Sequence, residues 1–161
     1  MKTTPFAALA LLAALSAPVW AQSVDVKNAW ARATVPGQKA SGAFMTLTAK
    51  DGAKLVSVSS PVAGVTEVHE MKMEGDVMKM RAVPQLDLPA GKAVELKPGG
   101  YHVMLMDLKQ PLQKDSTIAL TLVFKDAKGQ QSQTELKLPV SQAAPAGMAM
   151  DKKDAPVVHK H

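Results

Sequence analysis

The sequence predicts an all-β fold of the sandwich or barrel type, and two features carry that prediction. Short runs rich in Val, Leu, Thr and Ala recur at roughly 8- to 12-residue intervals between residues 23 and 140, which is typical of antiparallel β domains. Turn-forming residues separate these runs. Few windows place apolar residues at helical spacing over the length of a helix, so little helix is expected.

Each expected strand is a run of this kind that ends near a turn. Gly and Pro mark these turns because glycine adopts positive φ and proline cannot donate to a sheet ladder. In chain order, the expected strands and the turns that follow them are 24–27 and 30–34 (Pro36-Gly37), 42–49 (Asp51-Gly52), 54–59 and 65–73 (Gly75-Asp76), 77–82 (Pro89-Ala90-Gly91), 93–96 (Pro98-Gly99-Gly100), 101–108 and 117–124 (Lys128-Gly129), and 132–138.

Residues 1–21 have the three-part layout of a secretory signal peptide. Lys2 supplies a basic start, residues 6–15 form an apolar run, and Val19-Trp20-Ala21 places small residues at the −3 and −1 positions. The apolar run has about half the ~20 residues that a membrane-spanning helix needs, which argues against a retained anchor. We therefore expect cleavage after Ala21 and export to the periplasm.

The remainder divides into one domain and a tail. A length of 161 residues corresponds to about one domain, which we place at residues 22–140. Residues 141–161 are rich in Ala, Lys and Asp and contain no aromatic residue. Such a segment buries too little apolar surface to offset its ordering entropy, so we expect a disordered tail.

Composition excludes several classes of function. The chain has no cysteine, which excludes disulfides, thiolate zinc sites, iron–sulfur clusters, thiol nucleophiles and blue-copper sites. The formal net charge of +5 is small and the lysines are scattered, so no basic stripe for nucleic acid is present. The sulfur of this chain is thioether sulfur, carried by ten Met beside four His.

Methionine and histidine cluster in the middle of the chain. Six of the ten Met fall between residues 71 and 106, and His69 and His102 lie in or next to that window. Alternate side chains of a strand share a face. If Gly75-Asp76 is a two-residue hairpin turn, one face of the hairpin carries, in opposed pairs, Met71 with Met80 and Met73 with Met78, and His69 lies on the same face.

Imidazole and thioether together make a soft ligand set. His102, Met104 and Met106 share a face of the expected strand 101–108, so this strand can supply further donors of the same kind. Thioethers select Cu(I), whereas magnesium and calcium prefer oxygen and zinc prefers Cys, His and carboxylate. The alternative is that these Met are core filler, which explains methionine on a buried face but not the two histidines among them.

The spacing of His69, Met80, His102 and Met104 resembles the H-x10-M-x21-H-x-M copper signature of the periplasmic copper chaperones called PCu(A)C. The similarity extends over most of residues 23–140. It includes the segments Ala29-Trp30-Ala31-Arg32, Pro36-Gly37-Gln38, Ser60-Pro61-Val62-Ala63, Glu67-Val68-His69-Glu70, Leu96-Lys97-Pro98-Gly99-Gly100-Tyr101-His102 and Leu108-Lys109-Gln110-Pro111-Leu112.

The resemblance implies a cupredoxin-like Greek-key β-sandwich that binds one Cu(I) at an exposed edge through His69, Met80, His102 and Met104. It implies a copper chaperone that delivers the ion to the copper-receiving subunit of cytochrome c oxidase, in company with a Sco-type copper protein. Some members have Met directly after the first His, where this chain has Glu70. That departure makes Met71 a candidate auxiliary ligand.

The tail resembles the His- and Met-bearing C-terminal extensions of some members. Its side chains suited to a second, looser copper site, including one that captures Cu(II), are Met148, Met150, His159 and His161. The alternative is that these four residues have no metal role. A flexible tail would act by raising the local concentration of ligands near the folded site.

The candidate site suits transport better than catalysis, so we expect a non-enzymatic, monomeric copper protein. A catalytic metal keeps an open position and a nearby base, whereas Glu67, Glu70 and Glu74 have no evident partners in the sequence. Two alternatives remain. One is copper buffering or resistance without a delivery partner, and the other is a structural β-sandwich whose Met scavenge oxidants.

Overall fold

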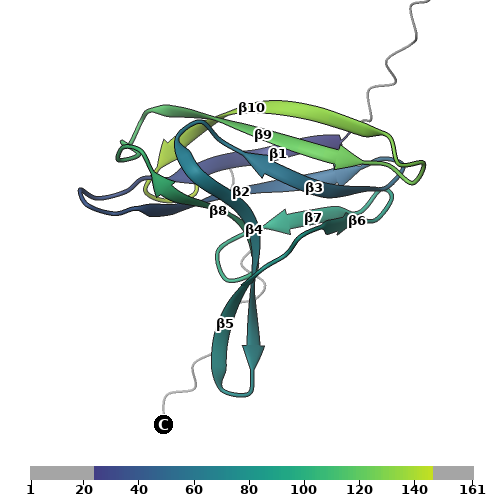
Figure 1. Cartoon of the computed structure of the whole chain (residues 1–161), viewed down its shortest axis with the longest axis horizontal. Helices are drawn as coiled ribbons and strands as arrows, with labels where there is room; N and C mark the ends of the chain where they lie inside the picture. Colours follow the sequence, from purple (N-terminus) through teal and green to yellow (C-terminus); the bar gives the residue numbers. More distant parts are fainter. Residues whose placement is uncertain (1–23, 147–161) are drawn as a thin grey trace, which may run out of the picture.

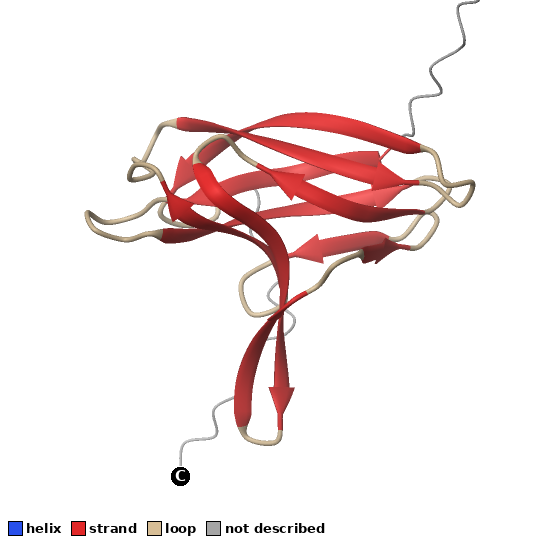
Figure 2. Ribbon diagram, viewed as in Figure 1, coloured by secondary structure: helices blue, strands red, loops and turns tan. Residues whose placement is uncertain are grey.

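The computed structural model describes residues 24–146, and these residues form strands and no helix (Figure 2). The all-β prediction is confirmed. The strands are β1 (Val24–Arg32), β2 (Ala40–Ala49), β3 (Ala53–Ser59), β4 (Ala63–Glu74), β5 (Val77–Ala82), β6 (Leu86–Leu88), β7 (Ala93–Leu96), β8 (Tyr101–Leu108), β9 (Thr117–Lys125) and β10 (Gln131–Ser141). No helix long and apolar enough to cross a membrane occurs between residues 24 and 146.

The strands form one continuous sheet in the order β5-β4-β8-β7-β2-β1-β10-β9-β3-β6. The parallel pair β1–β10, with Ala31 opposite Val140, joins a first half that runs from β5 to β1 to a second half that runs from β10 to β6 (Figure 1). One hydrophobic cluster contains side chains of both halves, among them Leu105 and Phe124. The halves therefore pack face to face, as in a cupredoxin-like sandwich.

The core follows from the alternation of inward and outward side chains, which is clearest in β9. In β9, Ile118, Leu120, Leu122 and Phe124 are buried and the residues between them are not. In the first half, Val103 and Leu105 of β8 point into the core at 0% exposure. Burial of each such side chain contributes roughly 1.5–3 kcal/mol, so the inward faces stabilise the fold without any disulfide.

Two elements differ from the expectation. Segments 24–27 and 30–34 form the single strand β1, which ends at Arg32 and is interrupted by a bulge between Lys27 and Trp30, where Asn28 has φ 56°. The polar residues of the bulge interrupt the apolar alternation, so the sequence pattern predicts two strands where the structure has one. Strand β6 was not expected, since its three residues are too short to show a period.

The hairpin β4–β5 projects from the sandwich as a two-stranded arm (Figure 1). It pairs from His69 opposite Ala82 to Glu74 opposite Val77, and this register is the predicted one. Gly75 opens the turn with φ 64°, which is typical of the first central position of a type II′ turn. The inner part of β4 pairs with β8 instead, so β4 connects the arm to the body.

Candidate metal centre

His69 and His102 form a directly opposed pair where the arm meets the body. They are register partners on β4 and β8, and their ring centroids lie 6.1 Å apart. Both are buried, at 9% and 7% exposure. Their neighbours Val68 and Val103 point into the core, so the histidines occupy the opposite, outer face of the same sheet.

Hydrogen bonds determine which nitrogen of each ring is free. His102 Nδ1–H donates to the Gly100 carbonyl oxygen at 3.0 Å, and His69 Nε2–H donates to Glu67 Oε2 at 2.9 Å. A carbonyl and a carboxylate only accept, so these nitrogens are the donors, and in an imidazole that binds a metal the other nitrogen of each ring supplies the lone pair. The lone pairs therefore lie on His102 Nε2 and His69 Nδ1. The latter is buried and has no hydrogen-bond partner among the described residues.

The spacing of the two rings allows one shared ion. A metal–imidazole bond is about 2 Å and a ring nitrogen lies about 1.2 Å from its ring centre, so two rings on opposite sides of one ion have centroids roughly 6.4 Å apart and two rings at a tetrahedral angle roughly 5.2 Å apart. The observed 6.1 Å lies between these values, so a tetrahedral site would need the rings about 1 Å closer. A buried nitrogen without a partner costs about 1–3 kcal/mol, which a bound ion would offset.

Thioethers lie near the histidine pair at both edges of β4, on β5 at one edge and on β8 at the other. We call each opposed pair of residues on this outer face a rung. The rung towards the arm is Met71 with Met80, and the rung towards the body is Glu67 with Met104. Successive rungs lie about 7 Å apart along the strands. Methionine is unbranched and has three rotatable bonds, so sulfur from either rung can approach the histidine pair.

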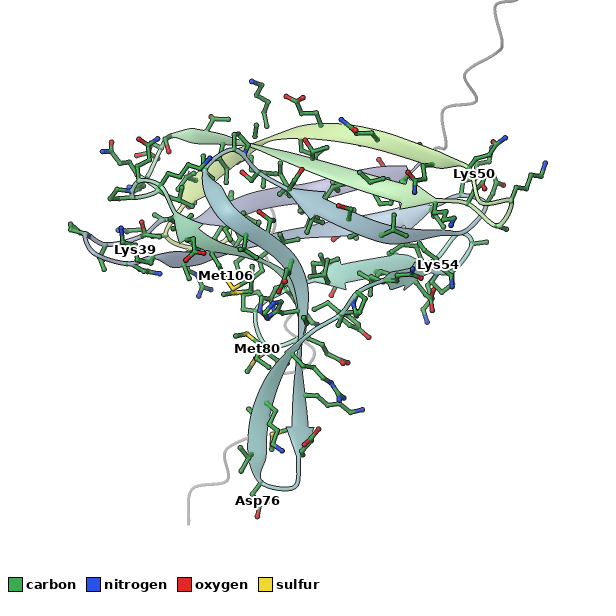
Figure 3. All side chains as sticks on the ribbon, in the orientation of Figure 1. Lys39, Lys50, Lys54, Asp76, Met80 and Met106 are labelled. Carbon is green, nitrogen blue, oxygen red and sulfur yellow. The ribbon has the colours of Figure 1, made fainter. Side chains whose placement is uncertain are left out.

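The exposed fraction of each methionine shows which of them pack in the core and which do not. Met45 is 2% exposed and belongs to the core, so the filler alternative holds for it. Met80 is 49% exposed, and Met71 and Met104 are half-buried. Met106 lies one rung further into the body, opposite Val65, and Figure 3 shows Met80 beside the junction between arm and body and Met106 above it at the body.

The opposite face of the arm carries charge instead of sulfur. Lys79 pairs with Glu74 at 2.7 Å, and Arg81 lies 3.8 Å from Glu70. Burial raises the pKa of Tyr101, and the Glu70 carboxylate, which accepts the phenol hydrogen bond, raises it further. Glu70, which stands where some relatives have Met, therefore points away from His69. Met71 lies on the same face as His69.

The nearby acids have contacts that the sequence did not make evident. Glu67 accepts from His69, Glu70 contacts Tyr101 and Arg81, and Glu74 pairs with Lys79. Glu67 is the residue of the site that the sequence interpretation missed. The available signal was its spacing, because a carboxylate two residues from a strand histidine shares the histidine's face.

A packed aromatic group borders the Met104 rung. Gly42 is the β2 partner of Met104, and a Cβ at Gly42 would lie 2.9 Å from the tip of the Phe44 ring. Trp30 stacks on Phe44 with centroids 4.9 Å apart, and the Arg32 guanidinium lies 5.3 Å from the Phe44 ring centre. Glycine is required at position 42 because the Phe44 ring occupies the space of a side chain.

The structure thus places three of the four signature residues on adjoining positions of β4 and β8, and the fourth, Met80, on the neighbouring rung of β5. Between residues 24 and 146, no three His, Asp or Glu side chains gather in a way that could hold a metal. The expected signal peptide and the tail residues Met148, Met150, His159 and His161 lie outside the described residues.

The fold and the outer-face site place this protein in the class of β domains that carry imidazole and thioether side chains near one edge of the sheet. Solved structures of similar fold include the "Copper-bound PCuAC domain from PmoF2", with a TM-score of 0.59, 21% identity and coverage of 74% of this chain and 93% of that one. The "Solution structure of CuI-DR1885 from Deinococcus Radiodurans" has a TM-score of 0.55 and 29% identity, covering 73% and 76%.

The chain belongs to the LpqE-like family, described as "Putative lipoprotein LpqE-like", whose model matches residues 24–140. A relative named "Putative lipoprotein Lxx21020" from Leifsonia xyli subsp. xyli is 35% identical over 107 residues. That alignment covers 66% of this chain and 64% of the relative, so the chain spans less than two thirds of the relative's length. Family and fold agree with the PCu(A)C resemblance.

Proposed function

We propose that this protein is an exported copper chaperone that binds one Cu(I) through His69, Met80, His102 and Met104. The observation that carries the proposal is the buried, opposed histidine pair, which has one free nitrogen on each ring and lies between two rungs that contain thioethers. The solved structure of CuI-DR1885, which is 29% identical to this chain, supports the choice of metal.

The donor set favours Cu(I) over harder ions. Two imidazoles and two thioethers are neutral, so the bound ion keeps a single positive charge and tolerates partial burial. Glu67 fixes the orientation of the His69 ring and, as a hydrogen-bonded carboxylate, increases the donor strength of its free nitrogen. Met71 lies opposite Met80 and serves as an auxiliary ligand that exchanges with it.

The mixture of buried and exposed ligands suits transfer. The histidines are almost fully buried, whereas Met80 is about half exposed on a projecting arm. An acceptor's ligand therefore displaces the exposed thioether first and the histidines last. Following the resemblance, the acceptor is the copper-receiving subunit of cytochrome c oxidase, with a Sco-type protein alongside, in the periplasm.

Two measurements test this function. Competition with a chromophoric Cu(I) chelator should give one tightly bound ion per chain, and X-ray absorption should report sulfur and nitrogen neighbours. Incubation of the loaded protein with the apo copper-binding domain of the oxidase subunit should then move copper to that domain. Tight binding without transfer would leave copper buffering as the function, and absence of tight uptake would refute the copper role itself.

A further inference from the structure

The arm displays methionines that are only partly buried. Met73 is 57% exposed, Met78 45% and Met80 49%, and Met71 is half-buried. These four form two successive rungs, Met71 with Met80 and Met73 with Met78, on the face that continues from His69. Figure 3 shows the arm extending from the body to Asp76 at its tip.

Packing does not account for these side chains. An isolated two-stranded hairpin is marginally stable in water, and exposed apolar side chains on it gain little burial. The ion pairs of Glu74 with Lys79 and Arg81, on the other face, are exposed and contribute at most about 1 kcal/mol each. Charged or threonine side chains would serve an exposed ribbon better, so four thioethers on one face call for a ligand.

We propose that Met71, Met73, Met78 and Met80 form a second Cu(I) site made of thioethers alone, at which copper enters and leaves the histidine site. The inference rests on the proposed copper-binding function. Opposed residues of an antiparallel pair have Cα atoms about 4.5–5.5 Å apart and successive rungs are about 7 Å apart, so three of these flexible side chains can reach one ion. Thioether ligands select Cu(I).

The two sites share a rung, which defines the path of the ion. Met71 and Met80 lie between the outer pair and the histidines, so they can bind copper in either position. The ion moves inward by exchanging the sulfurs of Met73 and Met78 for the nitrogens of His69 and His102. Copper stays Cu(I), every ligand stays neutral, and no electron or proton is transferred.

The ligands and the exposure of the outer site make it weaker than the inner one. The reverse face holds Lys72, Lys79 and Arg81 against Glu70 and Glu74, so its hard donors lie away from the thioethers, and with Asp76 at the tip the charges of the arm cancel. The outer site has no imidazole, and its side chains are exposed, so water competes for its ion. An exposed, weaker site that meets the partner first and a buried, tighter site behind it produce directional loading.

The test uses the full chain with methyl-labelled methionine and Cu(I) added without oxygen. Past one equivalent of Cu(I), the methyl resonances of Met73 and Met78 should shift, whereas those of Met45 should not. In His102→Ala the same resonances should respond from the first addition. Unmoved Met73 and Met78 resonances in both proteins would overturn the second site.

A matched variant pair tests the path. Met73→Leu with Met78→Leu keeps the apolar surface and removes the sulfurs, so it should slow copper transfer to an apo acceptor domain about tenfold or more. Affinity at the histidine site should stay within about twofold of the unsubstituted protein. Met106→Leu is the control and should change neither quantity. Unchanged transfer in the double variant would overturn the entry role and indicate a surface for protein contacts only.

The two proposals fail in different ways. If His102→Ala binds the first Cu(I) as tightly as the unsubstituted protein does, the proposed histidine site is wrong. If that variant loses affinity but the Met73 and Met78 methyls never respond, the histidine site stands and the second site falls.

Discussion

Glu67 allows the sharpest test of the metal centre, because it touches the proposed ligand His69 without binding the ion. Its Oε2 atom accepts from His69 Nε2–H at 2.9 Å, which leaves Nδ1 as the free nitrogen. Replacing Glu67 with Ala removes the group that holds this tautomer and ring orientation. We expect Glu67→Ala to bind Cu(I) more weakly while the fold is retained, since the Glu67 side chain is 46% exposed.

The size of the effect follows from the contact. Loss of a carboxylate partner of a metal-bound histidine typically lowers metal affinity 10- to 100-fold. The His69 side chain is 11% exposed but that of Glu67 is 46% exposed, so water screens part of the interaction. We therefore expect the lower end, about tenfold or ~1.4 kcal/mol. Glu67→Gln keeps an acceptor oxygen and loses the charge, so it should fall between Ala and the unsubstituted protein.

The assay is competition against a Cu(I) chelator, and Glu70→Ala is the matched control. Glu70 is adjacent to His69 in sequence but faces Tyr101 and Arg81, so its removal should leave copper affinity unchanged within about twofold. Equal losses in Glu67→Ala and Glu70→Ala would refute the positioning role. Tighter binding in Glu67→Ala would show that Glu67 competes with copper for Nε2, and would overturn the assignment of Nδ1 as the ligand.

Three further outcomes are expected. His102→Ala should weaken Cu(I) binding at least a hundredfold, whereas Met106→Leu should change it little, and equal losses in the chelator competition would show that the ligand assignment is wrong. Gly42→Ala should lower the free energy of unfolding by about 1 kcal/mol or more, because the added Cβ meets the packed Phe44 ring. A denaturant titration measures this, and an unchanged midpoint would contradict the reasoning. Truncation after Ala146 should leave Cu(I) affinity at the histidine site unchanged and abolish any Cu(II) uptake measured by electron paramagnetic resonance. If the truncated protein still takes up Cu(II), the tail is not the Cu(II) site.

Part of the candidate metal centre could be predicted from local sequence patterns. Period-two alternation assigned His69 and the methionines of β4 to one face, and Gly75-Asp76 set the register of the hairpin, as the structure confirms. Local patterns could not predict that His69 and His102 are register partners on adjacent strands. Their opposition depends on the pairing of β4 with β8 across more than thirty residues, and no local turn sets that register.

The missed features have physical reasons as well. The roles of Glu67 and of the ring nitrogens depend on side-chain conformations, which alternation does not specify. The close approach of Phe44 to Gly42 arises because the Phe44 ring lies along its own strand towards Gly42, which the sequence pattern does not encode.

The register of the arm also explains why the spacing between His69 and Met80 has to be strict. Side chains alternate between faces, so a one-residue insertion in β5 would turn its thioethers to the charged face. Lys79 would then take the place of Met80 opposite Met71, and a cation would stand where a soft ligand belongs. Hard and soft donors of the arm are thus kept apart by strand geometry alone. The same geometry that lines the proposed copper path with sulfur keeps the lysines of the arm off that path.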